Sequence, residues 1–255
     1  ILEDAGVGYV KIGVPTEERH ILATLHDATY QFGIDYLRDV WYSTSYLLDR
    51  KQSMNGCAKK RFENYKQQPL EFVFDKSFTG KLSQFGLDPN RRTPSGIKAA
   101  IIREKGTNGE REMAYMLYLA GFDVKDVTMT DLISGRETLE DINMVVYCGG
   151  FSNSDVLGSA KGWAGSFLFN PKAKAALDNF YAREDTLSLG VCNGCQLMME
   201  LGLITPEDKK KGKMLHNDSH KFESNFLGVT VPMNRSVMFG SLSGSKLGIW
   251  VAHGE

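Results

Sequence analysis

Hydrophobic residues beyond about position 97 recur in two alternating patterns: short continuous runs, and longer stretches with a helical period. Continuous runs of this length are typical of buried strands. They cover residues 97–102, 122–128, 142–147 and 186–191. Because strands that alternate with helices are typical of layered α/β folds, the pattern predicts a doubly wound, mostly parallel sheet. Ligands of such sheets bind at the carboxyl ends of the strands.

The helices of this region have recognisable limits. One helix has its apolar face at Met113, Met116, Leu117 and Ala120. Gly121 follows it and is a typical helix stop. Asn170 and Pro171 form a typical helix start, so we expect a second helix to run from there to about Tyr181. A third helix is expected at residues 195–203, directly behind the fourth strand.

The first part of the chain is less regular. Helical spacing connects the apolar residues Leu37, Val40, Trp41, Leu47 and Leu48. We interpret residues 36–54 as a packing helix. The polar stretch DPNRRTPS, residues 88–95, contains two prolines and is typical of a linker. We therefore expect a domain boundary near residue 93, between domains 1–92 and 93–255.

Composition narrows the class of protein. The 255 residues are 42% hydrophobic, and 30 Lys and Arg balance 31 Asp and Glu, which gives no argument for a nucleic-acid or anionic-membrane partner. Apolar runs stay below the roughly 18–20 residues of a membrane span, and no signal peptide is recognisable. Four cysteines are too few for a disulfide scaffold, so we expect a cytoplasmic protein. The missing initiator Met and the ending KLGIWVAHGE indicate a fragment of something longer.

The segment GVCNGCQ, residues 190–196, allows four interpretations. Cys192 and Cys195 with His216 and His220 have a spacing that a zinc site could use, although the cysteines open an apolar helix and not a polar knuckle. The same two cysteines could be a thioredoxin-like redox pair at a strand-to-helix junction. Cys192 could also be inert at a tight turn. The fourth interpretation is a nucleophile elbow, in which Cys takes the place of Ser in G-x-S-x-G.

The elbow interpretation accounts for most of the local pattern. Strand, turn and helix follow one another as the motif requires, and flanking glycines relieve crowding at a strained residue. The positive end of the following helix favours a thiolate. We expect the N–H of Asn193 to face a developing oxyanion, with a second donor from the turn Gly149-Gly150-Phe151 after the neighbouring strand. Cys195 then lies one turn along the helix and only packs.

GVCNGCQ resembles the nucleophile segment of class I glutamine amidotransferases. Other segments narrow the resemblance: IIREKGTNGEREMAYMLYLAGFDVKDV, CGGFSNSDVLGSAKGWAGSFLFN, HNDSHKFES and WVAHGE. Together they are similar to the glutaminase domain of the large, single-chain formylglycinamide ribonucleotide amidotransferases, also called phosphoribosylformylglycinamidine synthases. The resemblance implies a flavodoxin-like, three-layer sheet in residues 93–255. Residues 1–92 resemble the smaller α/β tail of the synthetase region and its helical connector.

The resemblance also implies the chemistry. Cys192 would attack the side-chain amide of L-glutamine, form a γ-glutamyl thioester and release ammonia, with Gly149, Gly150, Phe151 and Asn193 as the oxyanion hole. Gln196 would line the glutamine pocket. Ammonia would pass to the upstream synthetase region of the same parent chain, where formylglycinamide ribonucleotide becomes the amidine. ATP and Mg²⁺ would belong to that region, so we expect neither a cofactor nor a metal in this segment.

The chain differs from the family pattern at the general base of the reaction. His253 and Glu255 form a His-x-Glu pair, as the family's triad partners do. In the family, however, that pair follows a proline in a P-H-P-E segment further downstream. We therefore expect His253 and Glu255 to shape the glutamine pocket, and the triad pair to lie beyond residue 255.

Several features stay open. His216 and His220 fit a polar surface loop better than direct contact with glutamine. Lys161 and Trp163, in the glycine-rich GSAKGWAGS, fit a loop over the site or a plain connector equally well. Two alternative functions remain: a free-standing, DJ-1-like cysteine hydrolase, and a catalytically incomplete structural fragment.

Overall fold

The computed structural model describes residues 1–65, 70–207 and 212–255. The chain divides into two compact units: Ile1–Pro69 with Asp218–Lys221, and Leu70–Asn217 with Phe222–Glu255. They are called unit 1 and unit 2 below. The expected domain boundary near residue 93 stays a prediction.

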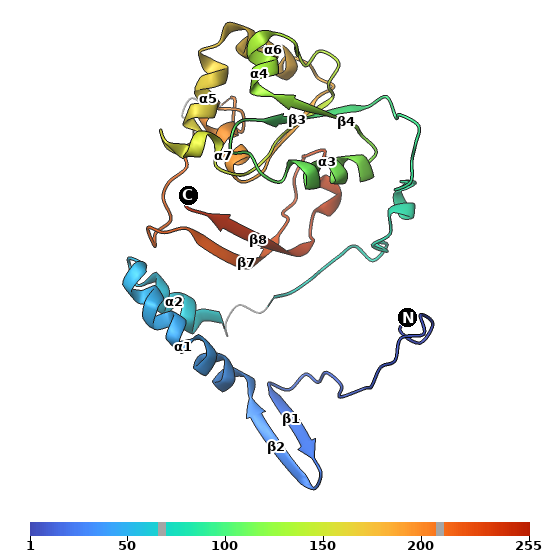
Figure 1. The fold of residues 1–255 in the computed structure, drawn as a ribbon, viewed down its shortest axis with the longest axis vertical. Helices are drawn as coiled ribbons and strands as arrows, with labels where there is room; N and C mark the ends of the chain where they lie inside the picture. Colours follow the sequence, from blue (N-terminus) through green and yellow to red (C-terminus); the bar gives the residue numbers. More distant parts are fainter. Residues whose placement is uncertain (66–69, 208–211) are drawn as a thin grey trace. The chain divides into compact units, whose positions relative to one another are not determined.

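The described residues of unit 2 include a four-stranded parallel sheet in the order β4-β3-β5-β6, of which Figure 1 labels β3 and β4. The strands are β3 (Lys98–Arg103), β4 (Asp123–Thr128), β5 (Met144–Tyr147) and β6 (Leu187–Gly190). Each overlaps a run that the apolar pattern predicted, with ends that agree to within two residues. The first strand in sequence is internal, so the chain winds outward from β3 in both directions. The carboxyl ends of β3 and β5 therefore meet where the winding reverses, which is the typical ligand position of such sheets.

Helices cover both faces of this sheet. They are α3 (Glu110–Leu119), α4 (Met129–Ser134), α5 (Lys161–Leu168), α6 (Pro171–Tyr181) and α7 (Asn193–Glu200). Short 3-10 turns lie at η2 (Leu82–Phe85), η3 (Ser152–Asp155) and η4 (Gly240–Leu242). Because strand side chains alternate between faces, β3 and β5 contribute to two separate cores, and the three-layer α/β class is confirmed.

Each face has its own set of buried residues. Ala100, Ile102, Val145 and Tyr147 point to the side covered by α4, α5, α6 and α7. Ala99, Ile101, Met144, Val146 and Cys148 point to the side where Leu117 of α3 packs. Burial of both faces explains why the strands appear in the sequence as continuous apolar runs and not as alternating ones.

Local signals fix several element ends. The Asn170 side chain accepts hydrogen bonds from the N–H groups of Lys172 and Ala173, so α6 begins where the sequence predicted. Gly121 adopts the left-handed φ of +98° just after α3. In α4, Thr128 and Asp131 form a reciprocal capping box.

Most of the segment GSAKGWAGS, residues 161–166, is helical, so both loop interpretations of Lys161 and Trp163 were wrong. It forms most of α5, and the Trp163 side chain is fully buried against Tyr147 with ring centroids 6.1 Å apart. Its glycines suggested a loop because glycine disfavours helices by about 1 kcal/mol per residue. Burial of the large Trp163 side chain opposes that local cost.

A separate antiparallel pair, β7 (Glu223–Thr230) and β8 (Lys246–His253), completes unit 2. Gly248 allows the rings of the neighbouring strand to lie close, since a Cβ there would be 2.4 Å from Phe226. The carboxyl end of β8 carries His253 toward the end of the described chain.

Unit 1 contains a hairpin and two helices. The hairpin pairs β1 (His20–Leu25) with β2 (Ala28–Gly33), and α1 (Ile34–Gln52) follows it directly, before α2 (Cys57–Asn64) (Figure 1). The helices meet through stacked Tyr46 and Phe62, whose ring centroids are 4.6 Å apart. The segment 218–221 joins this unit through Ser219, whose carbonyl accepts from the N–H of Met54 at 3.0 Å.

Buried side chains are scarce in unit 1. Ala58 is the one buried hydrophobic residue among its described residues. Helix α1 confirms the predicted helix at 36–54, but its expected packing was wrong: the side chains of Val40 and Trp41 are 53% and 81% exposed. A helical period in the sequence shows which face is apolar and leaves open what covers that face.

Candidate active site

Cys192 lies at a sharp turn between the last strand of the sheet and a helix. It is the N-cap of α7 and has φ 55° and ψ −116°, a conformation that side-chain-bearing residues rarely adopt. Such strain costs on the order of 1–3 kcal/mol and persists only where the surroundings enforce it. Strand, strained residue and helix N-terminus together form the geometry of a nucleophile elbow.

Two glycines make this turn possible. A Cβ on Gly194 would lie 2.0 Å from the carbonyl oxygen of Tyr147, so α7 can approach β5 only because that atom is missing. A Cβ on Gly190 would lie 2.7 Å from the carbonyl oxygen of Gly194 and 2.7 Å from Sδ of Met198. The spacing that drew attention in the sequence therefore reflects close packing of strand against helix.

The turn after β5 lies beside the cysteine. A Cβ on Gly149 would be 2.9 Å from Cβ and 3.4 Å from Sγ of Cys192. Gly150 has a φ of +113°, and a Cβ there would be 2.3 Å from the carbonyl oxygen of Gly106. The segment after β3 thus crosses the turn as an isolated antiparallel bridge between Thr107 and Gly150.

Hydrogen bonds define which N–H groups of the turn are occupied. The N–H of Phe151 donates to the Gly106 carbonyl at 3.0 Å, and the Gly149 carbonyl accepts from Asn108 at 2.8 Å. Asn193 is the first residue of α7, so its N–H has no acceptor within the helix. Among the described residues we find no acceptor for the N–H of Gly150. The oxyanion role of Gly149, Gly150, Phe151 and Asn193 stays a prediction, and this geometry favours the N–H groups of Gly150 and Asn193.

Gln196 lies on the same face of α7 as the elbow. Its Nε2 is 3.4 Å from Oε2 of Glu255, and its Oε1 accepts from Nδ2 of Asn193 at 2.9 Å. Oε1 of Glu255 lies 3.6 Å from Nδ1 of His216. The structure therefore brings the expected glutamine-binding residue together with the end of β8, and its role in binding glutamine stays a prediction.

The Asn193 side chain has a role that the sequence pattern did not reveal. It is 1% exposed, and its Oδ1 accepts from the N–H of Ser152 at 3.1 Å. Its Nδ2 also donates to Oδ1 of Asp155 at 3.2 Å. The helix and the loop after β5 are thus joined by one buried amide. An Asn after a cysteine gives no sequence signal for such a contact, because the partners lie about 40 residues away.

The loop that Asn193 contacts is itself strained. Asn153, Ser154 and Asp155 have left-handed φ values of 51°, 56° and 48° in succession. Left-handed backbone costs roughly 1–2 kcal/mol per residue for residues other than glycine, although Asn and Asp tolerate it best. Three such residues in a row indicate a loop whose shape is enforced by its surroundings.

The other cysteines of unit 2 lie in environments that suppress a thiolate. Burial raises the pKa of the Cys148 thiol to about 11. Burial also raises the pKa of Cys195, and the nearby Cys192 adds to that shift. These shifts count against Cys148 and Cys195 as nucleophiles, and the catalytic role of Cys192 stays a prediction. In the described residues no group of three or more His, Cys, Asp or Glu is arranged to hold a metal, so the four zinc-site candidates are not brought together.

No general base contacts Cys192 within the described ranges. The polar neighbour of its Sγ is the carbonyl oxygen of Ala252 at 3.9 Å, on β8. The His253 carbonyl accepts from Nδ2 of Asn217 at 2.7 Å, which fixes the backbone beside Ala252. β8 therefore contributes backbone to the vicinity of the thiol.

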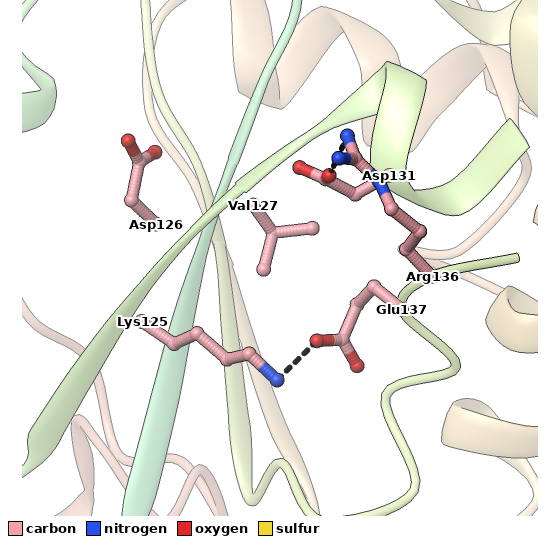
Figure 2. A pocket seen from close by; sticks show the side chains of 6 residues that line it. All are labelled: Lys125, Asp126, Val127, Asp131, Arg136 and Glu137. Carbon is pink, nitrogen blue, oxygen red and sulfur yellow. Dashed lines mark ion pairs between the residues drawn. The ribbon is translucent and has the colours of Figure 1, made fainter. Parts of the chain in front are cut away.

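Two hollows of unit 2 lie elsewhere. One, of about 160 Å³, is lined by Lys125, Asp126, Val127, Asp131, Arg136 and Glu137 (Figure 2). Its charges are already paired: Lys125 with Glu137, Arg136 with Asp131, and Asp126 with Arg103 outside the hollow. The other, of about 550 Å³, includes Arg91 and Tyr118. Neither is lined by Cys192, so neither replaces the elbow as the candidate site.

Comparison with known proteins agrees with this geometry. A family model for the CobB/CobQ-like glutamine amidotransferase domain matches residues 96–255. The chain belongs to this glutamine amidotransferase family. The match contains all the strands of the parallel sheet, the elbow and the strand pair that follows it. It does not favour the alternative of a DJ-1-like hydrolase.

Relatives of this amidotransferase chain are much longer proteins. It is 41% identical over 231 residues to the probable phosphoribosylformylglycinamidine synthase, chloroplastic/mitochondrial, of Arabidopsis thaliana, covering 86% of this chain and 16% of that protein. It is 36% identical to the phosphoribosylformylglycinamidine synthase of Drosophila melanogaster, covering 99% and 19%. The human protein of that name is 39% identical, with 86% and 17% covered. The chain thus spans less than a fifth of each of these relatives.

A solved structure also resembles the amidotransferase chain. It is described as PurLQS from Thermotoga maritima and has a TM-score of 0.48, 26% sequence identity, and coverage of 62% of this chain and 67% of that one.

None of the helices in the described part of the chain combines the length and the apolar character that a membrane span requires.

Proposed function

We propose that this chain is the glutamine-hydrolysing part of a phosphoribosylformylglycinamidine synthase and supplies ammonia for purine biosynthesis. The observation that carries the proposal is Cys192, held at φ 55° beside the Gly149 turn, in a chain whose residues 96–255 match a glutamine amidotransferase family. The shared name of the plant, fly and human relatives supports the pathway.

The reaction would begin when the Cys192 thiolate attacks the side-chain carbonyl carbon of glutamine. The carbonyl oxygen becomes an oxyanion, and the N–H groups of Gly150 and Asn193 are the donors best placed to stabilise it. Each such donor is worth roughly 3 kcal/mol of transition-state stabilisation. The C–N bond then breaks, the nitrogen takes up a proton and leaves as ammonia, and a thioester remains. Water hydrolyses the thioester to glutamate and restores the thiol.

We further propose that His253 and Glu255 are not the triad pair. The Glu255 carboxylate is engaged by Gln196 and by His216, at 3.4 Å and 3.6 Å, which supports a place in the glutamine pocket. A triad carboxylate would instead orient an imidazole that contacts the thiol, whereas the polar neighbour of Cys192 Sγ among the described residues is the Ala252 carbonyl oxygen. The base would then come from another segment of the parent protein, beyond residue 255.

Ammonia would be consumed by the synthetase region of the same parent chain, which would be the partner of this segment. ATP and Mg²⁺ would bind in that region, and no residue of this chain is assigned to them. A cytoplasmic location agrees with the sparse cysteines. The printed name of the Arabidopsis relative instead places that protein in the chloroplast or mitochondrion.

The test is affinity labelling of the full-length protein with 6-diazo-5-oxonorleucine, a reactive glutamine analogue. We expect peptide mass spectrometry to find the label on Cys192 and on neither Cys148 nor Cys195. Cys192→Ala should abolish glutamine-dependent synthesis of the amidine and leave ammonia-dependent synthesis largely intact. Equal loss of both activities would assign Cys192 a structural role and contradict the proposal.

The triad proposal has its own test. His253→Ala in the full-length protein should raise KM for glutamine more than it lowers kcat. A fall in kcat as deep as that of Cys192→Ala, with KM unchanged, would make His253 the base.

A further inference from the structure

The buried amide of Asn193 joins the parts of the site that must act together. Its Oδ1 accepts from the backbone of Ser152 at 3.1 Å. One N–H of its Nδ2 is directed at Oδ1 of Asp155, 3.2 Å away, and the other at Oε1 of Gln196, 2.9 Å away. The side chain thus makes three of the four hydrogen bonds that it can form, while it is 1% exposed. A surface residue of the first helical turn would need none of these.

These bonds fix the turn after β5 from one side, and the segment after β3 fixes it from the other. Ser152 is held by Asn193, whereas Phe151 is held by the Gly106 carbonyl at 3.0 Å. The two anchored N–H groups follow Gly150 directly in the chain. Gly150 therefore sits in a turn whose orientation is set on both sides, next to Gly149, which packs on the Cys192 side chain.

The same amide orients Gln196. Because Oε1 of Gln196 accepts from Asn193, its Nε2 is directed toward Glu255, 3.4 Å away. An unanchored Gln side chain could present either end of its amide, since the two ends differ only in hydrogen-bonding capacity. Asn193 thus favours one orientation.

We propose that the Asn193 side chain is a positioning residue, which clamps the turn after β5 against the elbow so that the Gly150 N–H faces the reacting carbonyl oxygen. This inference rests on the proposed glutaminase chemistry at Cys192. It also assigns a cause to the succession of left-handed residues 153–155: Asp155 is drawn toward Nδ2 of Asn193 and in turn accepts from the N–H of Ala160 at 3.2 Å.

The test compares Asn193→Leu with Leu197→Ala in the full-length protein. Leucine has nearly the shape of asparagine and cannot make these hydrogen bonds. Leu197 is fully buried on the same helix and makes no part of the clamp, so its truncation reports on destabilisation alone. Two rates are measured at Cys192 by peptide mass spectrometry: labelling by saturating 6-diazo-5-oxonorleucine, and alkylation by iodoacetamide, which requires no oriented carbonyl.

We expect Asn193→Leu to slow saturating labelling by the glutamine analogue about 10–100-fold, because misplaced groups lose catalytic efficiency steeply. Iodoacetamide alkylation should stay within about twofold, since the elbow itself persists. Leu197→Ala should leave both rates unchanged below its unfolding temperature.

The inference would be overturned by labelling of Asn193→Leu at the wild-type rate, or by a parallel fall of both rates in that variant. Failure of the glutamine analogue to label wild-type Cys192 would instead contradict the proposed function itself, and the inference with it. A fall of both rates in Leu197→Ala as large as in Asn193→Leu would show that only helix stability matters, and would also overturn it.

Discussion

Units 1 and 2 contain similar kinds of apolar residues, but the two units differ in how far these residues are buried. In unit 2, Ile102, Val145 and Trp163 are fully buried between the sheet and its helices. In unit 1, Val40 and Trp41 lie on a well-formed helix and are largely exposed. Because burial and not helix formation supplies most of the stabilisation, the same sequence pattern contributes very differently in the two regions.

The difference also explains where chemistry can be placed. A strained residue persists only where packing enforces its conformation. Cys192 has that support from Tyr147, Met198 and the helix that begins at Asn193, all in the buried part of unit 2. Unit 1 offers few buried contacts that could hold a nucleophile in such a conformation.

The largest effect should come from truncating a tryptophan. Trp163→Ala removes a side chain that is fully buried, and we expect the free energy of unfolding of unit 2 to fall by about 3–5 kcal/mol. Trp41→Ala removes one that is 81% exposed, and the change should stay within about 0.5 kcal/mol. Guanidinium titrations followed by circular dichroism measure both. A loss of several kcal/mol for Trp41→Ala would mean that its face is covered, and the comparison would fail.

An intermediate effect should come from adding one methyl group. Gly194→Ala places a Cβ 2.0 Å from the Tyr147 carbonyl oxygen, so α7 must move away from β5. We expect about 1–3 kcal/mol of destabilisation, together with loss of labelling at Cys192. In unit 1, the Cβ added by Gly56→Ala would have no atom within 4 Å. The destabilisation should therefore come only from the left-handed φ of +68° and amount to roughly 1 kcal/mol. Thermal unfolding of the pair measures the difference, and equal shifts would contradict the tight packing at Gly194.

The smallest effect should appear only in acid. The Arg91 guanidinium, with the N–H groups of Ser95 and Gly96, holds the pKa of Asp123 at about 2, below the ordinary 3.8. Its folded-state pKa is lowered, so its contribution is complete above about pH 4 and is lost as the pH falls toward 2. Asp123→Asn should therefore make the free energy of unfolding of unit 2 depend less on pH between those two values. Near pH 7 its dependence on pH should be unchanged. An unchanged acid slope would show that this pairing is not maintained in solution.

The sequence predicted the fold of unit 2 well because its signals are local. Asn170 and Pro171 located the start of α6 correctly, and the apolar runs located the four parallel strands to within a residue or two. Trp163 was misjudged because its glycine neighbours suggested a loop, while the tertiary packing that makes it helical leaves no local signal. The hairpin β1–β2 passed without notice, since its exposed strands lack a buried face to create a pattern.

The candidate site divides in the same way. Cys192 could be found from the sequence, because strand, glycine spacing and helix are adjacent in the chain. The contacts of Asn193 with Ser152 and Asp155 could not, since they depend on how two loops approach each other in space. Glu255 was expected near the glutamine pocket on family resemblance; it contacts Gln196, and the role of both residues in binding glutamine stays a prediction.

Finally, the assignment of Asp218–Lys221 to unit 1 means that the chain crosses from one unit to the other three times. Unit 1 is therefore not a detachable module. A protein that began at residue 70 would keep the loop 218–221 but lose the residues of unit 1 that this loop contacts. Ser219 would become solvated, and Lys221 would be parted from the Asp49 carboxylate. Trimming this protein for expression would need a redesigned loop as well as a new terminus.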